Sequence, residues 1–118
     1  MEISCTFNGS VAVLDLTGRF VVSPGETEVL PLRAAVKALI AEGRTQVALN
    51  LAGLAAIDAR GLGELVYTLT TLRRYGGNLT LIAPPRAVRR PLAATRLDTV
   101  LSICDSELEA TRPPDDGR

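Results

Sequence analysis

The sequence predicts one α/β domain with a mixed β-sheet, and three observations favour this fold class. Strand-like and helix-like segments alternate along most of the 118 residues, which is typical of parallel strands joined by crossover helices. The dipeptide Asn8-Gly9 is a hairpin signal between the first two strand-like segments, so we expect that pair to be antiparallel. A chain of this length forms one domain with one hydrophobic core. We therefore expect roughly four to five strands and about four helices.

The first half of the chain is expected to contain the hairpin and one crossover helix. Strands are expected over 3–7 and 11–17, with Gly18 ending the second. The order Ser23-Pro24-Gly25-Glu26 matches a capping box with proline in the first turn, which marks the start of a helix. Apolar residues at helical spacing indicate that helix, and Gly43 should end it. These apolar positions are Val29, Leu32, Val36, Leu39 and Ile40.

The second half repeats the alternation. We expect strands over 46–51, 78–83 and 100–104, and helices after Asp58, over 86–95 and over 105–110. Residues 111–118 are polar and proline-rich, so we expect a domain over 1–110 and a disordered C-terminal tail over 111–118. The helix after Asp58 should end at Gly76-Gly77, and its apolar face should consist of Leu62, Leu65, Val66, Leu69 and Leu72. In the helix over 86–95, Val88 and Leu92 should face inward.

Composition narrows the function classes. The chain has no histidine and two isolated cysteines, Cys5 and Cys104. This excludes triads and general bases that use histidine, and nearly all zinc sites. Because paired carboxylates at useful spacing are also missing, we expect no enzyme activity, no cofactor and no metal. Each cysteine lies in an apolar strand-like run, so we expect both to be buried as small hydrophobic residues, with a disulfide only if their strands adjoin.

Hydropathy and charge favour a cytoplasmic, protein-binding domain. No apolar run approaches the roughly 20 residues that span a bilayer, and the N-terminus lacks the features of a signal peptide. The formal net charge is zero, yet six arginines and no acid lie between residues 65 and 97, namely Arg73, Arg74, Arg86, Arg89, Arg90 and Arg96. They form either a solvated helix face or a docking face for an acidic partner. Nucleic-acid binding is least favoured, because the domain is neutral and has few aromatic residues.

The most informative segment is the corner Ile57-Asp58-Ala59-Arg60-Gly61-Leu62-Gly63, where an apolar run ends in an acid and a helix begins. Asp58 is predicted to cap the helix, because its carboxylate accepts backbone N–H groups and meets the positive end of the helix dipole. Gly61 is unfavourable in a helical first turn, so we expect it to permit close backbone packing or the approach of a partner. The glycines are not a phosphate-binding loop, because no Gly-Lys-Ser or Gly-Lys-Thr follows them.

Three patterns of the chain, taken in their order and spacing, match a known family. The first is the strand-like stretch over 11–20, which ends in Gly18-Arg19-Phe20, and the second is the corner itself. The third is the stretch over 74–81, followed by Pro84 and then by Leu97-Asp98. Together they resemble the STAS domain of bacterial anti-sigma factor antagonists. The resemblance covers about residues 3–110 and implies a STAS-like fold.

The resemblance implies a non-enzymatic regulator of transcription that acts by partner-switching. In that family the unphosphorylated domain binds an anti-sigma factor that is also a serine kinase, and phosphorylation at the corner ends the binding. The family pattern has two hydroxyl residues after the aspartate, where this chain has Ala59 and Arg60. Arg60 thus occupies the phospho-acceptor position, and Val21 stands where the family commonly has an acid. We expect no phosphorylation at the family site.

The expected partner-binding surface joins a turn to the corner. Arg60 is either a tolerated surface arginine or a partner contact, since arginine is frequent at binding hot spots. The expected partner is a serine-kinase anti-sigma factor or another signalling protein, without direct membrane insertion. An alternative from the same resemblance is an accessory subunit of a membrane lipid-transport ATPase complex. The expected contact residues are Ser23, Pro24, Gly25, Asp58, Ala59, Arg60, Gly61 and Leu62.

Overall fold

Five strands form one mixed sheet in the computed structural model, which describes residues 1–21 and 30–111. The strands lie side by side in chain order; β1 pairs antiparallel with β2, and each later neighbouring pair is parallel. The predicted mixed sheet with an N-terminal hairpin and parallel crossovers is confirmed. The elements are β1 (Glu2–Asn8), β2 (Val11–Phe20), α1 (Leu30–Ala41), β3 (Gln46–Ile57), α2 (Ala59–Arg74), β4 (Asn78–Ile82), α3 (Arg86–Ala94), the 3-10 turn η1 (Leu97–Thr99), β5 (Ser102–Cys104) and α4 (Glu107–Thr111).

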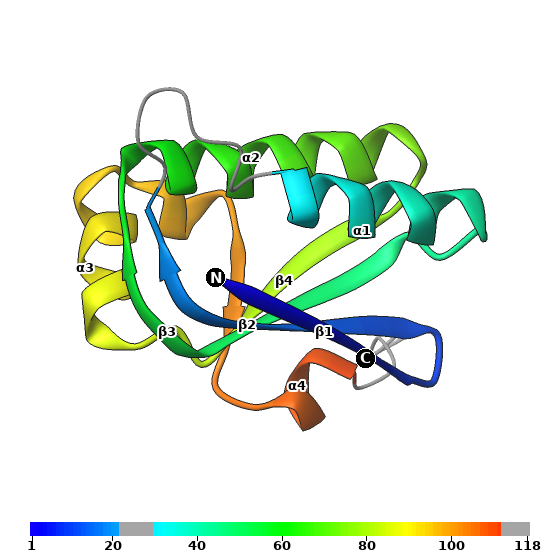
Figure 1. Cartoon of the computed structure of the whole chain (residues 1–118), viewed down its shortest axis with the longest axis horizontal. Coiled ribbons are helices and arrows are strands. Elements are labelled where there is room, and N and C mark those ends of the chain that lie inside the picture. Colours follow the sequence, from blue (N-terminus) through cyan, green and yellow to red (C-terminus); the bar gives the residue numbers. More distant parts are fainter. Residues whose placement is uncertain (22–29, 112–118) are drawn as a thin grey trace, which may run out of the picture.

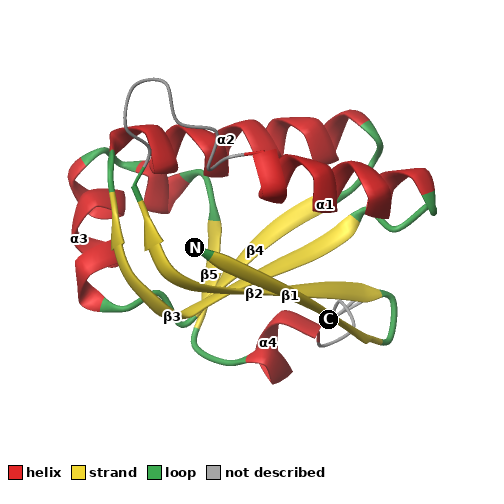
Figure 2. Cartoon of the chain, in the orientation of Figure 1, coloured by secondary structure: helices red, strands yellow, loops and turns green. Residues whose placement is uncertain are grey.

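Helices cover the two faces of the sheet unequally. Figure 1 shows α1, α2 and α3 on one face of the sheet and the short α4 on the other. Figure 2 shows the same two layers as red helices against yellow strands. The main core lies under the three longer helices, where the paired residues Leu14, Leu49 and Leu81 form a row across three strands. On the opposite face, the buried hydrophobic residues in the described part of the chain form a small cluster of Val13, Ala48 and Ile82, against which Ala110 of α4 packs.

The β1–β2 hairpin closes one residue later than the sequence indicates. Asn8 is the last residue of β1 and pairs with Val11, so the turn consists of Gly9 and Ser10. Gly9 has a φ of +63°, whereas Asn8 is absent from the residues with positive φ. Glycine at the first turn position and an ordinary φ at the second fit a type II′ turn. The hairpin prediction is confirmed, and the assignment of its turn to Asn8-Gly9 is wrong by one position.

Two strands run further than predicted. β2 does not end at Gly18 but continues to Phe20. Gly18 takes a φ of +95° within the strand. β3 continues past Leu51 to Ile57, and its pairing with β2 shifts register twice, after Asp15 and after Gly18. Such shifts are β-bulges, which add a residue to one strand and turn the following side chains to the other face. The bulges explain why no simple alternation marked the second half of β3.

Glycines end both long helices as predicted. Gly43 follows α1 with a φ of +78°, and Gly76 follows α2 with a φ of +81°. After α1, Gly43 N–H donates to the Ile40 carbonyl (2.9 Å) and Arg44 N–H to the Leu39 carbonyl (2.8 Å). After α2, Gly76 and Gly77 make the equivalent two bonds. Both ends are therefore Schellman motifs, in which a left-handed residue lets the chain satisfy the last carbonyls.

The C-terminal part differs from the prediction mainly in its boundaries. α3 buries Val88 and Leu92 as expected. The predicted last strand over 100–104 is shorter than expected, because Val100 and Leu101 form a turn after η1 and β5 begins only at Ser102. Thr111, predicted to begin the tail, is the last residue of α4. The rest of the predicted tail, 112–118, and the predicted capping box at 23–26 lie outside the described residues.

The two cysteines lie on strands at opposite edges of the sheet and are both free thiols. Cys5 is exposed, so the prediction of its burial is wrong: it lies on the edge strand β1 and belongs to neither of the two buried clusters. Cys104 is half-buried, and its thiol donates to the Ser106 carbonyl. Burial raises the pKa of the Cys104 thiol, so less reactive thiolate is present at neutral pH.

Replacing a buried leucine by alanine should destabilise the protein much more than the same change at an exposed leucine. Leu65 of α2 is fully buried, whereas Leu108 of α4 is 75% exposed. We expect Leu65→Ala to lower the free energy of unfolding by about 2–5 kcal/mol, because a cavity replaces core contacts. Leu108→Ala should change it by less than about 0.5 kcal/mol. Urea titrations followed by circular dichroism measure both, and equal losses in the two variants would contradict this packing.

Candidate functional site

The corner between β3 and α2 is held together by backbone hydrogen bonds and one carboxylate. Asp58 is the N-cap residue, with extended backbone, and its Oδ1 accepts a hydrogen bond from the Gly61 N–H at 2.8 Å. Its own N–H donates to the Phe20 carbonyl at 3.2 Å, at the end of β2. The predicted cap is confirmed. It ties the start of α2 to the carboxyl ends of two parallel strands.

Gly61 lies where α2 meets the end of β2. A Cβ atom at this position would lie 2.6 Å from the Phe20 carbonyl oxygen and 2.7 Å from Cγ1 of Ile57. Both distances are shorter than real side chains tolerate, and one of the opposing atoms belongs to the backbone. Of the two roles expected for Gly61, close backbone packing is therefore the one that the structure bears out. It also buries Gly61, together with Leu62.

The outer surface of the corner consists of three exposed residues. Ala59, Arg60 and Gly63 face solvent, whereas Leu62 is 5% exposed. A Cβ atom on Gly63 would meet no described atom within 4 Å. Ser23, Pro24 and Gly25, the other part of the predicted contact surface, lie outside the described residues. The structure thus gathers the predicted residues 58–62 into one turn, and Ala59 and Arg60 form its accessible part.

Arg60 is a cation at the positive end of a helix. The first turn of α2 contains no acidic residue, and among the described residues the Arg60 side chain has no ion-pair or hydrogen-bond partner. A cation near a helix N-terminus is mildly destabilising. Local stability therefore gives no reason for arginine here.

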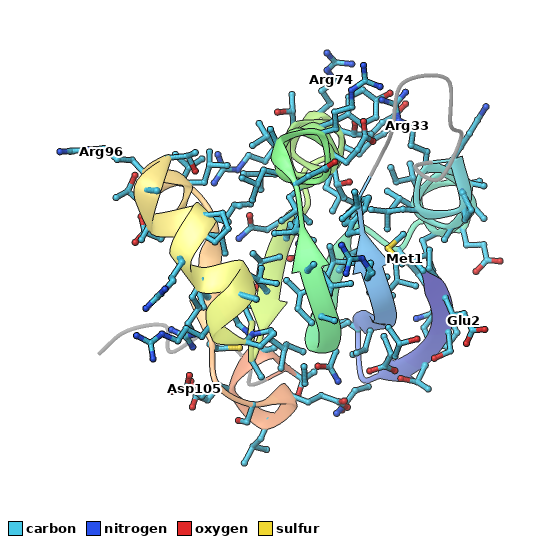
Figure 3. All side chains as sticks on the ribbon, turned by 60° about the vertical axis from the view of Figure 1, so that its left-hand side comes forward. Met1, Glu2, Arg33, Arg74, Arg96 and Asp105 are labelled. Atoms are coloured by element: carbon cyan, nitrogen blue, oxygen red, sulfur yellow. The ribbon has the colours of Figure 1, made fainter. Side chains whose placement is uncertain are left out.

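The arginine-rich stretch predicted as one face is divided by the fold. Arg73 and Arg74 end α2, whereas Arg86, Arg89 and Arg90 belong to α3. In Figure 3, Arg74 and Arg96 project from well-separated parts of the molecule. Arg89 is already engaged, because it donates to the Pro84 carbonyl and to Asp105, both at 2.9 Å. The six arginines thus lie on α2, on α3 and just before η1, and not on one helix face.

An ion pair between α1 and α2 was not visible in the sequence. Arg33 of α1 donates two hydrogen bonds to the Glu64 carboxylate, at 2.9 and 2.7 Å, and its guanidinium lies 4.1 Å from the ring centre of Tyr67. The hydrogen bonds to Glu64 raise the pKa of Arg33. The helical spacing of Glu64 and Tyr67 indicated that they share a face, but nothing local indicated their partner on another helix.

A groove of about 530 Å³ runs beside this ion pair, between α1 and α2. Its walls carry the cations Lys37 and Arg74, the rings of Tyr67 and Tyr75, and the apolar side chains of Val36 and Ile40. Among the described residues, no group of three or more Cys, Asp or Glu side chains is placed to hold a metal ion. Nor does the described part of the chain contain a helix long and apolar enough to cross a membrane.

A family model described as "Mlab, STAS domain" matches residues 3–103, which is most of the chain. This protein belongs to the STAS domain family. The matched residues include the strand-turn-helix corner over 57–63.

Relatives of this STAS domain include anti-sigma factor antagonists. A Thermotoga maritima protein assigned as an anti-sigma factor antagonist is 33% identical over 69 residues, which are 58% of this chain and 61% of that relative. The match therefore spans less than two thirds of the relative's length. A crystal structure of a Thermotoga maritima protein with the same assignment has a TM-score of 0.75 at 23% identity, over 92% of this chain and 90% of that one.

The antagonist SpoIIAA, solved in its unphosphorylated form, is a second structural neighbour of the STAS domain. It has a TM-score of 0.68 at 18% identity and covers 92% of both chains. Identities this low show a shared fold. Similarity of fold does not assign roles to the corner residues, so these roles are inferred from the residues of this chain.

Two glycines of the STAS corner should respond oppositely to alanine. Gly61→Ala should lower the free energy of unfolding by about 1–3 kcal/mol, because the new methyl group meets the Phe20 carbonyl. Gly63→Ala, two residues further along α2, should raise it by about 1 kcal/mol, because alanine favours the helix and no described atom lies within 4 Å of the new methyl group. Urea unfolding measures both. A Gly61→Ala protein as stable as the wild type would contradict the close approach.

The cap should depend on an acceptor at residue 58 more than on its charge. Asp58→Ala should lower the free energy of unfolding by about 1 kcal/mol, since the Gly61 N–H loses its acceptor. Asp58→Asn should remain within about 0.5 kcal/mol of the wild type, because asparagine caps nearly as well. Thermal and urea unfolding provide the comparison. Equal losses in both variants would assign the effect to charge.

Proposed function

We propose that this STAS domain is a non-enzymatic, protein-binding regulator that acts like an anti-sigma factor antagonist and lacks the phosphorylation switch at its corner. The partner binds the outer surface of the corner, formed by Ala59, Arg60 and Gly63. The similarity to anti-sigma factor antagonists supports the class of function. The chemistry of the corner supports the loss of the switch.

Gly63 is the observation that carries the proposal. A glycine inside a helix lowers stability by about 1 kcal/mol relative to alanine, and no described atom requires its small size. Gly61, by contrast, is explained by packing within the chain. Bare backbone at an exposed position, next to Ala59, allows another protein to approach α2 closely. The demand for glycine at residue 63 therefore fits a contact with a partner.

Arg60 gives this surface its charge. Arginine binds carboxylates through two parallel hydrogen bonds and is frequent at binding hot spots. Because its charge is positive, it does not imitate a phosphate group. An acidic side chain of the partner is the matching group.

The absence of a hydroxyl at residues 59 and 60 removes the acceptor expected from the family pattern. Thr68 of α2 is a poor substitute, because it is 2% exposed and its hydroxyl donates to the Glu64 carbonyl at 2.8 Å. A phosphate at the corner would add nearly two negative charges to the interface. Without an acceptor there, binding persists in the presence of kinase and ATP.

The second candidate is a cytoplasmic accessory subunit of a membrane lipid-transport ATPase complex. The description of the matching family model favours keeping it, because that description names Mlab rather than an anti-sigma factor antagonist. The same corner would then bind a transport ATPase. Affinity capture from the native organism with mass spectrometry separates the candidates. A serine-kinase anti-sigma factor supports the first, and an ATPase with its permease supports the second.

Charge reversal at the corner should weaken partner binding. Arg60→Glu is expected to raise the dissociation constant by about tenfold or more, whereas Arg73→Glu, an exposed arginine at the far end of α2, should change it less than about twofold. Isothermal titration calorimetry with the captured partner measures both. Unchanged affinity for Arg60→Glu would remove Arg60 from the interface.

Phosphate transfer tests the missing switch directly. With the partner kinase and ATP, the wild-type mass should stay unchanged, and Arg60→Ser should gain one phosphate and lose affinity. Phosphate on the wild-type chain, for instance at Ser23, would show a relocated switch and contradict the proposal. If the captured partner has no kinase activity, the result favours the second candidate, the transport complex.

A further inference from the structure

The two edges of the sheet differ in how well they are protected against pairing with another strand. β5 forms one edge and is only three residues long. β1 forms the other and has seven residues, paired with β2 without a register shift. Short strands, bulges, prolines and lysines are the usual protections of an edge. β1 has none of them.

The hairpin turn determines which backbone groups of β1 point outward. In a hairpin with a two-residue turn, the residues that flank the turn form a hydrogen-bonded pair, here Asn8 and Val11. Hydrogen-bonded and non-bonded pairs then alternate along the strands. Ile3, Cys5 and Phe7 fall in the non-bonded pairs, so their N–H and C=O groups face away from β2. Figure 3 shows β1 at the margin of the molecule, with Glu2 directed away from the other strands.

The sequence of β1 complements itself when two copies run antiparallel about Cys5. In that register Ile3 of each copy lies opposite Phe7 of the other, so the apolar residues pair with each other. Phe7 is 52% exposed in the single chain. On the other face Ser4 pairs with Thr6, and Glu2 pairs with Asn8, whose amide also donates to Glu107 at 3.1 Å. Each side chain thus meets one of matching character.

We propose that this protein forms a two-fold symmetric dimer through antiparallel pairing of β1 with β1 of a second copy, centred on Cys5. The outward groups of Ile3, Cys5 and Phe7 make about six main-chain hydrogen bonds across the interface. The dimer joins two sheets into one continuous sheet. A second copy suits this edge better than an unrelated strand, because the register is symmetric in both apolar and polar pairs.

The dimer leaves the proposed partner-binding corner accessible. The corner lies at the carboxyl ends of β2 and β3, and not on β1. A two-fold axis through Cys5 places the two corners at opposite ends of the joined sheet. The dimer then offers two corners to partners. Whether the dimer forms does not depend on the function of the corner.

The main test compares three substitutions at one exposed position. Cys5→Ala keeps the backbone N–H and should leave the dimer intact. Cys5→Pro removes the N–H that faces outward and spares the β1–β2 ladder, so it should give a folded monomer. Cys5→Lys places two ammonium groups opposite each other at the axis, and should raise the dimer dissociation constant at least about tenfold. Sedimentation velocity over a range of concentrations measures association, and circular dichroism verifies folding.

Oxidation provides an independent readout of the register. Paired Cys5 residues would have Cα atoms about 5.5 Å apart, within the range that a disulfide spans. Diamide, which accepts the two electrons, should therefore link Cys104→Ser chains into dimers and leave Cys5→Ser chains unlinked. Cys104 is half-buried and serves as the matched thiol.

Two results would overturn the proposal. One is a wild-type protein that remains monomeric up to millimolar concentration. The other is a dimer that persists equally in Cys5→Ala, Cys5→Pro and Cys5→Lys, which would place the interface on another surface. Should Cys5→Pro fail to fold, the Cys5→Lys and Cys5→Ala comparison decides the question alone.

Discussion

The close approach of α2 to the end of β2 is the contact on which the candidate site depends. The Phe20 carbonyl accepts the Asp58 N–H, and its oxygen lies only 2.6 Å from the place that a Cβ atom on Gly61 would take. Only glycine permits this distance. The contact joins two parallel strands to the helix that follows one of them, and it buries Gly61 and Leu62. Because the inner side of the turn is filled by backbone, its outer side can vary without loss of the fold.

The charges near the corner follow from this arrangement. Asp58 is engaged in capping, and Glu64, one turn further along α2, is held by Arg33. Both carboxylates on this stretch of the chain therefore already have partners within the protein. Arg60 remains as the accessible charge on the first turn. An exposed surface with one cation and bare backbone would suit a partner with an acidic group, rather than one with a large apolar patch.

Features that depend on neighbouring residues could be predicted from the sequence, whereas side-chain contacts between distant elements could not. Asp58, Gly43 and Gly76 act within a few residues of their own position, so the cap and the helix ends could be predicted. The end of β3 could not, because Leu51, Leu54 and Ile57 are buried or half-buried at intervals of three and lack the alternation of a regular strand. The pairing of Arg33 with Glu64 joins two helices far apart in sequence. The exposure of Cys5 depends on strand order, which hydropathy does not report.

The two bulges of β3 constrain how the length of this segment can change in evolution or design. Each inserts one residue relative to β2, and each reverses which side chains face the helices. Since there are two, the reversals cancel, and Ile57 returns to the same parity as Val47. Because each bulge is one extra residue opposite β2, loss of that residue would restore regular pairing and leave Ile57 opposite Phe20. The length of β3 between Asn50 and Ile57 can therefore change by one residue at a time, as a bulge is gained or lost, while the Asp58 cap stays beside Phe20.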